Sequence, residues 1–287
     1  MSAAAPVTVV IPARDAATTI DAQLAALAAQ DHPGPITVIV ADNGSVDGTG
    51  ARVEAWADRL PDVRVVDAGD RPGAAHARNV GTAAAATDLV LCCDADDVAD
   101  PAWVRHLVAG LGDADVVAGG TASFVGAAPS GPSPRGGFGT AGFGFLPALT
   151  TASCGYHRRV WEAVDGFDED LPLACEDLDF GWRVQLAGFT LAQVPEGYVH
   201  YREPPTATAV LRRWYRYGAA QPRLFRRFGP SGLRRDPPTR VLAAWARLVL
   251  HGYRLLQGGT ARRHWCRDAG RRAGRLTGSL RTRTWYL

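Results

Sequence analysis

One short segment, DLVLCCDADDVAD at residues 88–100, most constrains how this chain can fold. Residues 89–93 form a continuous apolar run, which is typical of a strand buried on both faces of a sheet. The run ends in Asp94, Asp96 and Asp97, whose carboxylates repel one another and are costly to desolvate without a cation. Mg²⁺ or Mn²⁺ would meet that need. The alternative is that the acids face water and cap the helix that follows.

Further apolar runs indicate strands at residues 7–11, 36–40 and 63–66, with helical patterns between them. The alternation continues over the first 118 residues. It predicts right-handed crossovers and an α/β fold in which helices flank a mostly parallel central sheet. In such sheets, ligands bind beyond the carboxyl ends of the strands.

Polar loops follow all four of these strands, at residues 12–15, 42–49, 71–79 and 94–97. Asp42 could accept hydrogen bonds from a base or a ribose, or simply form the turn at Asn43-Gly44. Arg78 could offer a bidentate fork to a phosphate or carboxylate, or lie on the surface of a helix. The sequence has no GxxxxGK[ST] loop and no GxGxxG after the first strand. Phosphate binding through a metal is therefore favoured over binding by a glycine-rich loop.

Two further sets of polar residues occur later in the chain. Glu176 and Asp177 begin a helical pattern, where acids are common because of the helix dipole alone. A lone carboxylate facing the site could instead take a proton from an attacking hydroxyl. His200 follows a short apolar run and is either a late metal ligand or an ordinary buried side chain.

The charge of the chain is divided unevenly. Residues 1–204 hold 12 Arg and 27 acidic residues, whereas residues 205–287 hold 19 Arg and 2 Asp, a formal charge of +17. The boundary predicts a catalytic domain at 1–204 and a basic helical extension at 205–287. The extension is expected to meet an anionic surface: the acidic domain itself, a membrane or nucleic acid.

Within the extension, Arg240, Arg247 and Arg254 recur every seven residues on an otherwise apolar helical pattern. This helix could lie on an anionic membrane with Trp245 and Tyr253 at the interface, or pack its apolar face on the domain. The last 17 residues, 271–287, are expected to be poorly ordered. The Gly- and Pro-rich residues 126–147 are predicted to form a flexible lid.

The five Cys form no CxxC pattern, and the N-terminus shows no secretory pattern. No window of 18 apolar residues is free of charge. We therefore expect a cytoplasmic protein. If the basic extension binds a membrane, we expect the protein to associate peripherally with its inner face.

Taken together, the motifs resemble those of the family 2 glycosyltransferases, and they occur in that family's order. The matching segments cover residues 5–202 and read VTVVIPARD, VIVADNGSVDGT, RPGAAHARNVG, LVLCCDADD, VDGFDE and CEDLDFGWR. The resemblance implies the GT-A fold, a Rossmann-like sheet, and transfer of a sugar from a UDP-, dTDP- or GDP-linked donor to an acceptor hydroxyl with inversion. It also implies a divalent metal, Mg²⁺ or Mn²⁺. The acceptor could be a lipid-linked or cell-envelope glycan or a small metabolite.

The same resemblance assigns roles to individual residues. It places the nucleotide-sugar contacts at Pro12, Ala13, Asp15, Asp42, Arg78, Asn79 and Asp94. It makes Asp94-Ala95-Asp96 a DxD motif, with Asp96 the metal ligand, Asp94 nearer the ribose, and His200 a further metal contact. Asp177 of the Glu176-Asp177 pair corresponds to the catalytic base. At a helix N-terminus its pKa is expected to be lowered.

Some features depart from the family or favour other functions. Arg14 and Asp15 replace a frequent aromatic residue and Asn, which leaves the base open. The QxxRW signature of processive synthases is absent, since LRRWYRYG at 211–218 lacks the Gln. The alternatives are a nucleic-acid-binding protein, which leaves the acid cluster unexplained and is less favoured, or a non-catalytic sugar-nucleotide-binding protein. A nucleotidyltransferase would be expected to carry a Gly-rich phosphate loop, which PARDAATT is not.

Overall fold

The computed structural model describes residues 5–60, 62–126, 143–171 and 174–287. Most of the predicted lid at 126–147 lies outside the described residues. The chain divides into two compact units. The first, here called the sheet unit, consists of Met1–Ala141, Leu146–Asp170 and Glu176–Arg202. The second, the helical unit, consists of Gly142–Phe145, Leu171–Cys175 and Glu203–Leu287.

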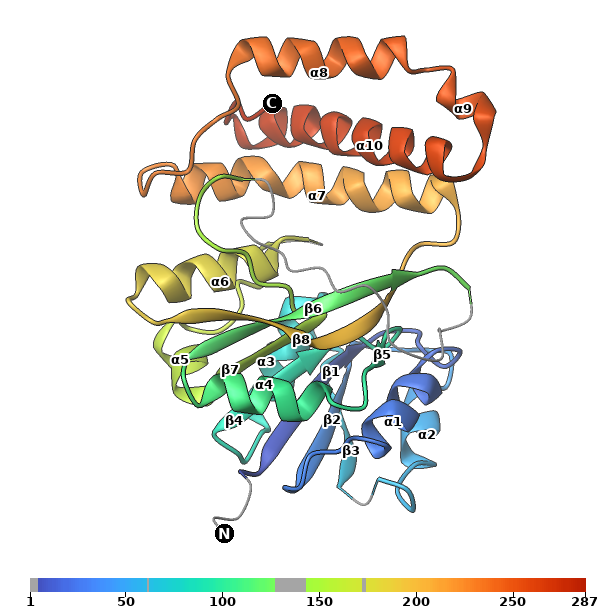
Figure 1. Ribbon diagram of the computed structural model, residues 1–287, viewed down its shortest axis with the longest axis vertical. Coiled ribbons are helices and arrows are strands. Elements are labelled where there is room, and N and C mark those ends of the chain that lie inside the picture. Colours follow the sequence, from blue (N-terminus) through green and yellow to red (C-terminus); the bar gives the residue numbers. More distant parts are fainter. Residues whose placement is uncertain (1–4, 61, 127–142, 172–173) are drawn as a thin grey trace. The chain divides into compact units, whose positions relative to one another are not determined.

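The sheet unit is built on eight strands in the order β3-β2-β1-β4-β7-β6-β8-β5 (Figure 1). Their bounds are β1 Val7–Ala13, β2 Ile36–Asp42, β3 Val63–Asp67, β4 Leu89–Cys93, β5 Val98–Ala99, β6 Val116–Phe124, β7 Ser153–His157 and β8 Leu191–Arg202. The apolar run at 89–93 is β4, and it pairs in parallel with β1. Its three central residues are fully buried, as expected for a strand covered on both faces.

The sheet is mixed beyond β4. β1, β2, β3 and β4 run parallel, as the alternating pattern predicts. β7 then pairs antiparallel with both β4 and β6, and β5 pairs antiparallel with β8. β1 also continues past Pro12 to Ala13, further than the sequence suggested. Its pairing with β4 stops at Val10, so among the described residues Pro12 has no strand neighbour on the β4 side. A proline is tolerated there because no partner strand needs its missing N–H.

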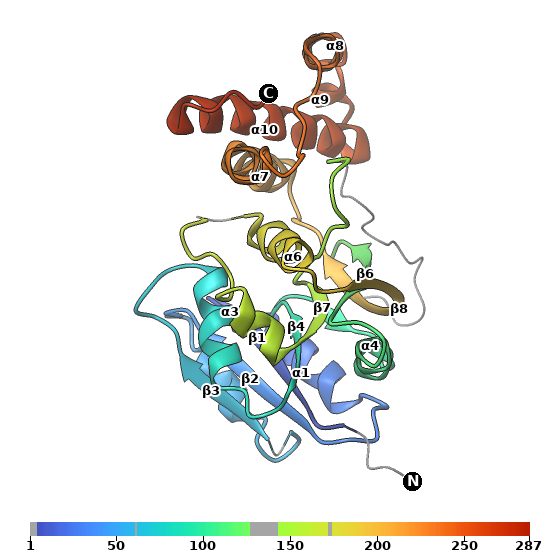
Figure 2. The same ribbon diagram turned by 90° about the vertical axis from the view of Figure 1, so that its left-hand side faces the viewer.

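Helices cover both faces of this sheet (Figure 2). Their bounds are α1 Ile20–Ala28, α2 Thr49–Glu54, α3 Ala74–Ala83, α4 Trp103–Leu111, α5 Arg158–Ala163 and α6 Glu176–Leu186. One core lies under α1, α2 and α4 and includes Leu24 and Trp103. A second core lies under α3, α5 and α6 and contains the stacked rings of Phe167 and Phe180, whose centroids are 4.4 Å apart. Both cores hold the strand ends, and the loops that follow them, in fixed positions.

The helical unit contains α7 Ala207–Phe228, α8 Pro238–Leu250, α9 Arg254–Gln257 and α10 Gly259–Thr282. Within it, α10 lies between α7 and α8 (Figure 1). Glycines bring α7 and α10 into backbone contact: a Cβ at Gly274 would overlap the carbonyl oxygen of Tyr215 and lie 2.8 Å from the nitrogen of Ala219. Gly270 and Gly278 face α7 in the same way.

The expectation of poor order at 271–287 is wrong, because this segment belongs largely to α10. Beyond the helix, Tyr286 is 3% exposed and stacks on Phe225 of α7, with ring centroids 5.1 Å apart. Composition suggested disorder because it is rich in Arg and Gly. The spacing of the glycines, every four residues, is what permits the close packing.

The predicted basic helix across 239–257 is interrupted. α8 ends at Leu250, and Arg254 begins the separate short helix α9. Among the described residues, no helix has both the length and the apolar character needed to cross a membrane.

Candidate functional site

The acid cluster lies at the carboxyl end of β4. One carboxylate oxygen from each of Asp94, Asp96 and Asp97 lies within 4.8 Å of the others. Asp97 is 1% exposed, and its Oδ1 accepts a hydrogen bond of 2.8 Å from the backbone N–H of Arg202 on β8. Asp96 is exposed and Asp94 is partly buried. A compact set of carboxylate oxygens is the donor chemistry that Mg²⁺ and Mn²⁺ take, so these residues fit such an ion.

Arg78 joins this cluster to the start of α6. Its Nη2 donates to Oδ1 of Asp94 and its Nη1 to Oε1 of Glu176, each at 2.8 Å. The side chain projects from α3, where it is 3% exposed. Burial alone would lower the pKa of Arg78, but the attraction of Asp94 and Glu176 outweighs it and raises that pKa. Arg78 is therefore a fixed buried cation, not a surface residue of its helix.

Asp177 lies beside this ion-pair network. Its Oδ1 accepts a 2.8 Å hydrogen bond from the N–H of Leu178. Burial, and next the neighbouring charge of Glu176, raise the pKa of Asp177 to about 7. The expectation of a lowered pKa is thus wrong, because desolvation and like charge outweigh the helix-end hydrogen bond and Arg78. Asp94 also contributes to raising it, so the two acidic motifs lie in one electrostatic environment.

The loops after β1 and β2 are tied to each other. Ala13 lies opposite Asp42 in the parallel register, directly after Pro12. Asp15 accepts a 3.0 Å hydrogen bond from the N–H of Val46, and its own N–H donates to Oγ of Ser45 at 2.9 Å. Oδ1 of Asp42 accepts from the N–H of Ser45 at 2.9 Å, which is the turn-forming role that the sequence also allowed. The fold therefore places Pro12, Ala13, Asp15 and Asp42 together at one edge of the sheet.

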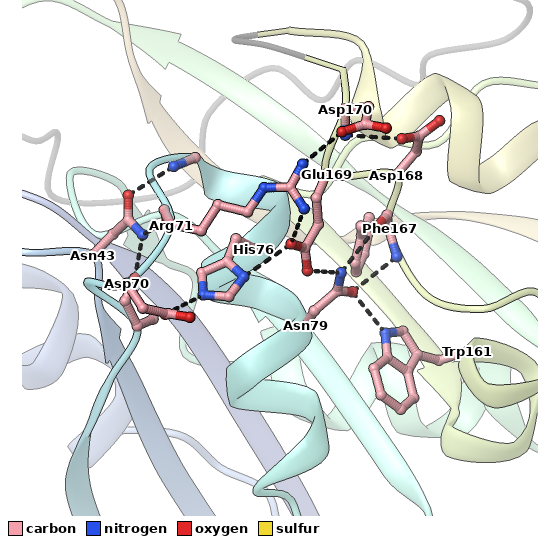
Figure 3. Close-up of polar contacts among 12 residues, drawn as sticks. Asn43, Asp70, Arg71, His76, Asn79, Trp161, Phe167, Asp168, Glu169 and Asp170 are labelled. Carbon is pink, nitrogen blue, oxygen red and sulfur yellow. Dashed lines mark hydrogen bonds and ion pairs between the residues drawn. The ribbon is translucent and has the colours of Figure 1, made fainter.

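Asn79 holds the loop between α5 and α6 against α3 (Figure 3). Its Oδ1 accepts hydrogen bonds from Nε1 of Trp161 at 3.0 Å and from the N–H of Phe167 at 2.8 Å. Its Nδ2 donates to the carbonyl of Phe167 at 2.9 Å and to Oε1 of Glu169 at 2.8 Å. These four bonds use the full capacity of the amide. The nucleotide contact of Asn79 stays a prediction, and it would require one of these four bonds to be exchanged for a bond to the ligand.

Glu169 is the second anchor of that loop, and the residue patterns alone gave it no role. Its carboxylate accepts from Nη1 of Arg71 at 3.0 Å and bonds to Nδ1 of His76 at 3.0 Å (Figure 3). Nε2 of His76 lies 2.7 Å from Oδ1 of Asp70. Burial alone would lower the pKa of His76, but the two carboxylates more than offset this and raise it. The VDGFDE motif contained Glu169, but nothing in the sequence indicated which partners it would meet.

His200 lies on β8, opposite Val98 of β5. It is 4% exposed, its ring packs edge-on against Tyr198 with centroids 5.4 Å apart, and burial lowers its pKa. Within the described part of the chain, the close carboxylate group at the end of β4 does not include His200. Its role as a metal ligand stays a prediction.

Comparison with known families matches the two halves of the chain separately. The model described as "Glycosyl transferase family 2" matches residues 8–146. The model described as "Glycosyl transferase family group 2" matches residues 137–266. Together they span the acid cluster, the Glu176-Asp177 pair and most of the helical unit. The chain belongs to the family 2 glycosyltransferases.

Solved structures agree with the GT-A fold of this glycosyltransferase. A mannosyltransferase, PcManGT, from Pyrobaculum calidifontis, in complex with GDP-Man and Mn²⁺, is 20% identical with a TM-score of 0.67, covering 96% of this chain and 88% of that one. Residues 1–349 of TarS from S. aureus, in complex with UDP, are 19% identical with a TM-score of 0.54, covering 98% and 93%. At these identities the likeness concerns the fold. No curated protein matches the sequence significantly.

Proposed function

We propose that this glycosyltransferase moves a sugar from a nucleotide-diphosphate sugar to an acceptor hydroxyl with inversion at the anomeric carbon. The observation that supports it most is the Arg78 bridge, at 2.8 Å to both Asp94 and Glu176. It ties a candidate diphosphate and metal site to Glu176, the residue next to the candidate base Asp177.

Asp177 is the proposed general base. The acceptor oxygen attacks the anomeric carbon from the face opposite the leaving group and forms the new C–O bond. The bond from that carbon to the diphosphate breaks, and its electron pair leaves with the nucleoside diphosphate. Asp177 takes the proton that the acceptor oxygen loses. A pKa near 7 suits this step, because the group is then partly ionised and still basic at neutral pH.

Asp94 and Asp96 are the proposed ligands of Mg²⁺ or Mn²⁺. When bound, the ion would neutralise charge on the diphosphate. Arg78 holds Asp94 in place, and Asp97 fixes the loop to β8 through the N–H of Arg202. Proposed donor contacts are Pro12, Ala13, Asp15 and Asp42, while Asn79 and Glu169 act as positioning residues for the 165–170 loop.

A ligand screen can assign the donor base and the acceptor. Relatives of this fold are solved with GDP-Man, UDP and UDP-GlcNAc. GDP, UDP and dTDP, each with Mg²⁺ or Mn²⁺, are therefore the first ligands for a thermal-shift screen. The corresponding sugar nucleotides then serve in a transfer assay against glycan, lipid-linked and small-molecule acceptors.

The deciding experiment compares Asp177→Asn with Asp96→Ala by calorimetry and transfer assay. Asp177→Asn is expected to keep nucleotide affinity and lose roughly 10²–10⁴-fold in kcat, the usual contribution of a general base. Asp96→Ala is expected to lose metal-dependent affinity. Asp113→Asn, an exposed acid before β6 at the opposite edge of the sheet, is the matched control and should behave like the native protein.

Two results would contradict the proposal. Undiminished turnover in Asp177→Asn would remove this residue from the base role. Nucleotide binding without turnover of any sugar nucleotide by the native protein would favour a sugar-nucleotide-binding protein that does not catalyse.

A further inference from the structure

The outer face of α8 and α9 carries large apolar side chains in contact with solvent. No residue of either helix is buried. Leu242 is 69% exposed, Val249 76%, Leu250 73% and Leu256 87%. Leu242 and Val249 are seven residues apart and share one helical face. A run of aliphatic side chains this exposed is rare on a surface that meets water alone.

The opposite side of α8 faces the rest of the helical unit. Nε1 of Trp265 on α10 donates a 2.9 Å hydrogen bond to the carbonyl of Leu248. Trp245 and Leu248 are partly buried, in contrast to Leu242 and Val249. Of the two aromatic residues expected at the interface, Trp245 is partly buried and Tyr253 is 53% exposed. The aliphatic row, not the tryptophan, is the surface that remains available.

The segment that carries the aliphatic row is positively charged. Residues 237–267 hold six Arg and no acidic residue. Arg240 and Arg247 are seven residues apart on α8. At about 100° per residue they lie roughly 160° and 140° around the helix from Leu242, but only about 80° and 60° from Leu250, at the edge of the aliphatic row. The surface thus has an excess of cation with apolar side chains beside it.

We propose that α8 and α9 lie flat on an anionic lipid bilayer, with Leu242, Val249, Leu250 and Leu256 in the interface and Arg240, Arg247 and Arg254 near lipid phosphates. Adjacent apolar and basic rows are the pattern of helices that bind in the plane of a membrane. Nucleic acid would use the cations but leave the aliphatic row in water. A second copy would bring together two units of the same strong positive charge.

The inference extends the proposed function, on which it rests in one respect: a lipid surface is where a transferase would meet a lipid-linked acceptor. Lipid binding itself can be measured without any transfer reaction. A failure of this inference is therefore distinct from a failure of the proposed chemistry.

The test is sedimentation of the full chain with vesicles of phosphatidylcholine, with and without phosphatidylglycerol. The native chain is expected to bind the anionic vesicles at least tenfold more tightly, and to lose this preference in about 0.5 M NaCl. The double variant Val249→Asp/Leu256→Asp is expected to lose about tenfold or more in partitioning. Arg240→Gln/Arg247→Gln should lose the preference for anionic lipid and keep weak binding.

The matched control is Leu280→Asp on α10, a leucine that is 59% exposed but outside the proposed face. It should bind vesicles like the native chain, and circular dichroism should show native helix content in every variant. Equal binding to both vesicle types, or equal losses in Leu280→Asp and the double variant, would overturn the proposal. So would tight binding of single-stranded RNA that needs the Arg but not the aliphatic residues, or a dimer that the double variant dissociates.

Discussion

The two units hold their helices in place by different means. In the sheet unit, α3 is joined to α6 and to the preceding loop by buried polar bonds, through Arg78 and Asn79. In the helical unit, α10 meets α7 through glycines whose backbones touch. Directional bonds position a few atoms closely, as chemistry requires. Close backbone packing stabilises a platform without fixing any particular polar atom.

The largest expected effect is that of removing the buried cation. Arg78→Met should lower the free energy of unfolding by about 3–5 kcal/mol, because Asp94 and Glu176 would be left without their partner. Urea denaturation measures it. Arg105→Met, which breaks an exposed pair with Asp31, is the control and should cost less than about 1 kcal/mol. Equal losses of unfolding free energy in the two variants would show that the buried bridge stabilises the protein no more than an exposed ion pair.

Asn79→Ala should follow in size. It removes four hydrogen bonds between α3 and the loop, which we expect to cost about 2–4 kcal/mol and to increase proteolysis within residues 161–170. Gln185→Ala is the matched amide control. Its Nε2 donates hydrogen bonds to the carbonyls of Pro147 and Gly181, and among the described residues it makes no bond to the 165–170 loop. A native cleavage pattern in Asn79→Ala would refute the positioning role.

In the helical unit, helix propensity and packing predict opposite signs for Gly274→Ala. Propensity alone favours Ala by about 1 kcal/mol, whereas overlap with the backbone of Tyr215 should give a net loss of roughly 1–3 kcal/mol. The neighbouring Ala273→Gly, at an exposed position, should lose only about 0.5–1 kcal/mol. Thermal unfolding of both variants shows whether helix propensity or steric overlap has the larger effect at Gly274. Stabilisation by Gly274→Ala would contradict the close contact of α7 with α10.

The last prediction concerns the dependence of stability on pH. The folded-state pKa of Asp177 is raised from 3.8 to about 7, so the folded protein keeps a proton that the unfolded chain releases. Asp177 therefore lowers stability as pH rises from about 4 to about 7. Asp177→Asn should melt at a higher temperature than the native protein at pH 8, and the difference should vanish near pH 4. A difference independent of pH would argue against the raised pKa.

The family could be identified from the sequence because its motifs are local. The apolar run at 89–93 and the acids after it are adjacent in the chain, so periodicity and spacing indicate both the strand and the site beyond its end. The parallel order of β1 to β4 follows from the same alternation of strands and helices.

Other features depend on contacts between distant residues. Asn79 meets Phe167 and Glu169 across 88 and 90 positions, and such pairings are not visible in a linear pattern. The charge state of Asp177 depends on how deeply the fold buries it, which reversed the expectation drawn from its helix end. The order of 271–287 depends on glycines meeting a second helix. The sequence by itself determined the first four strands, the helices between them and the acids that follow β4, since these depend on local periodicity. Only the tertiary structure decided how those groups are buried and paired, because desolvation and partner choice depend on the whole fold.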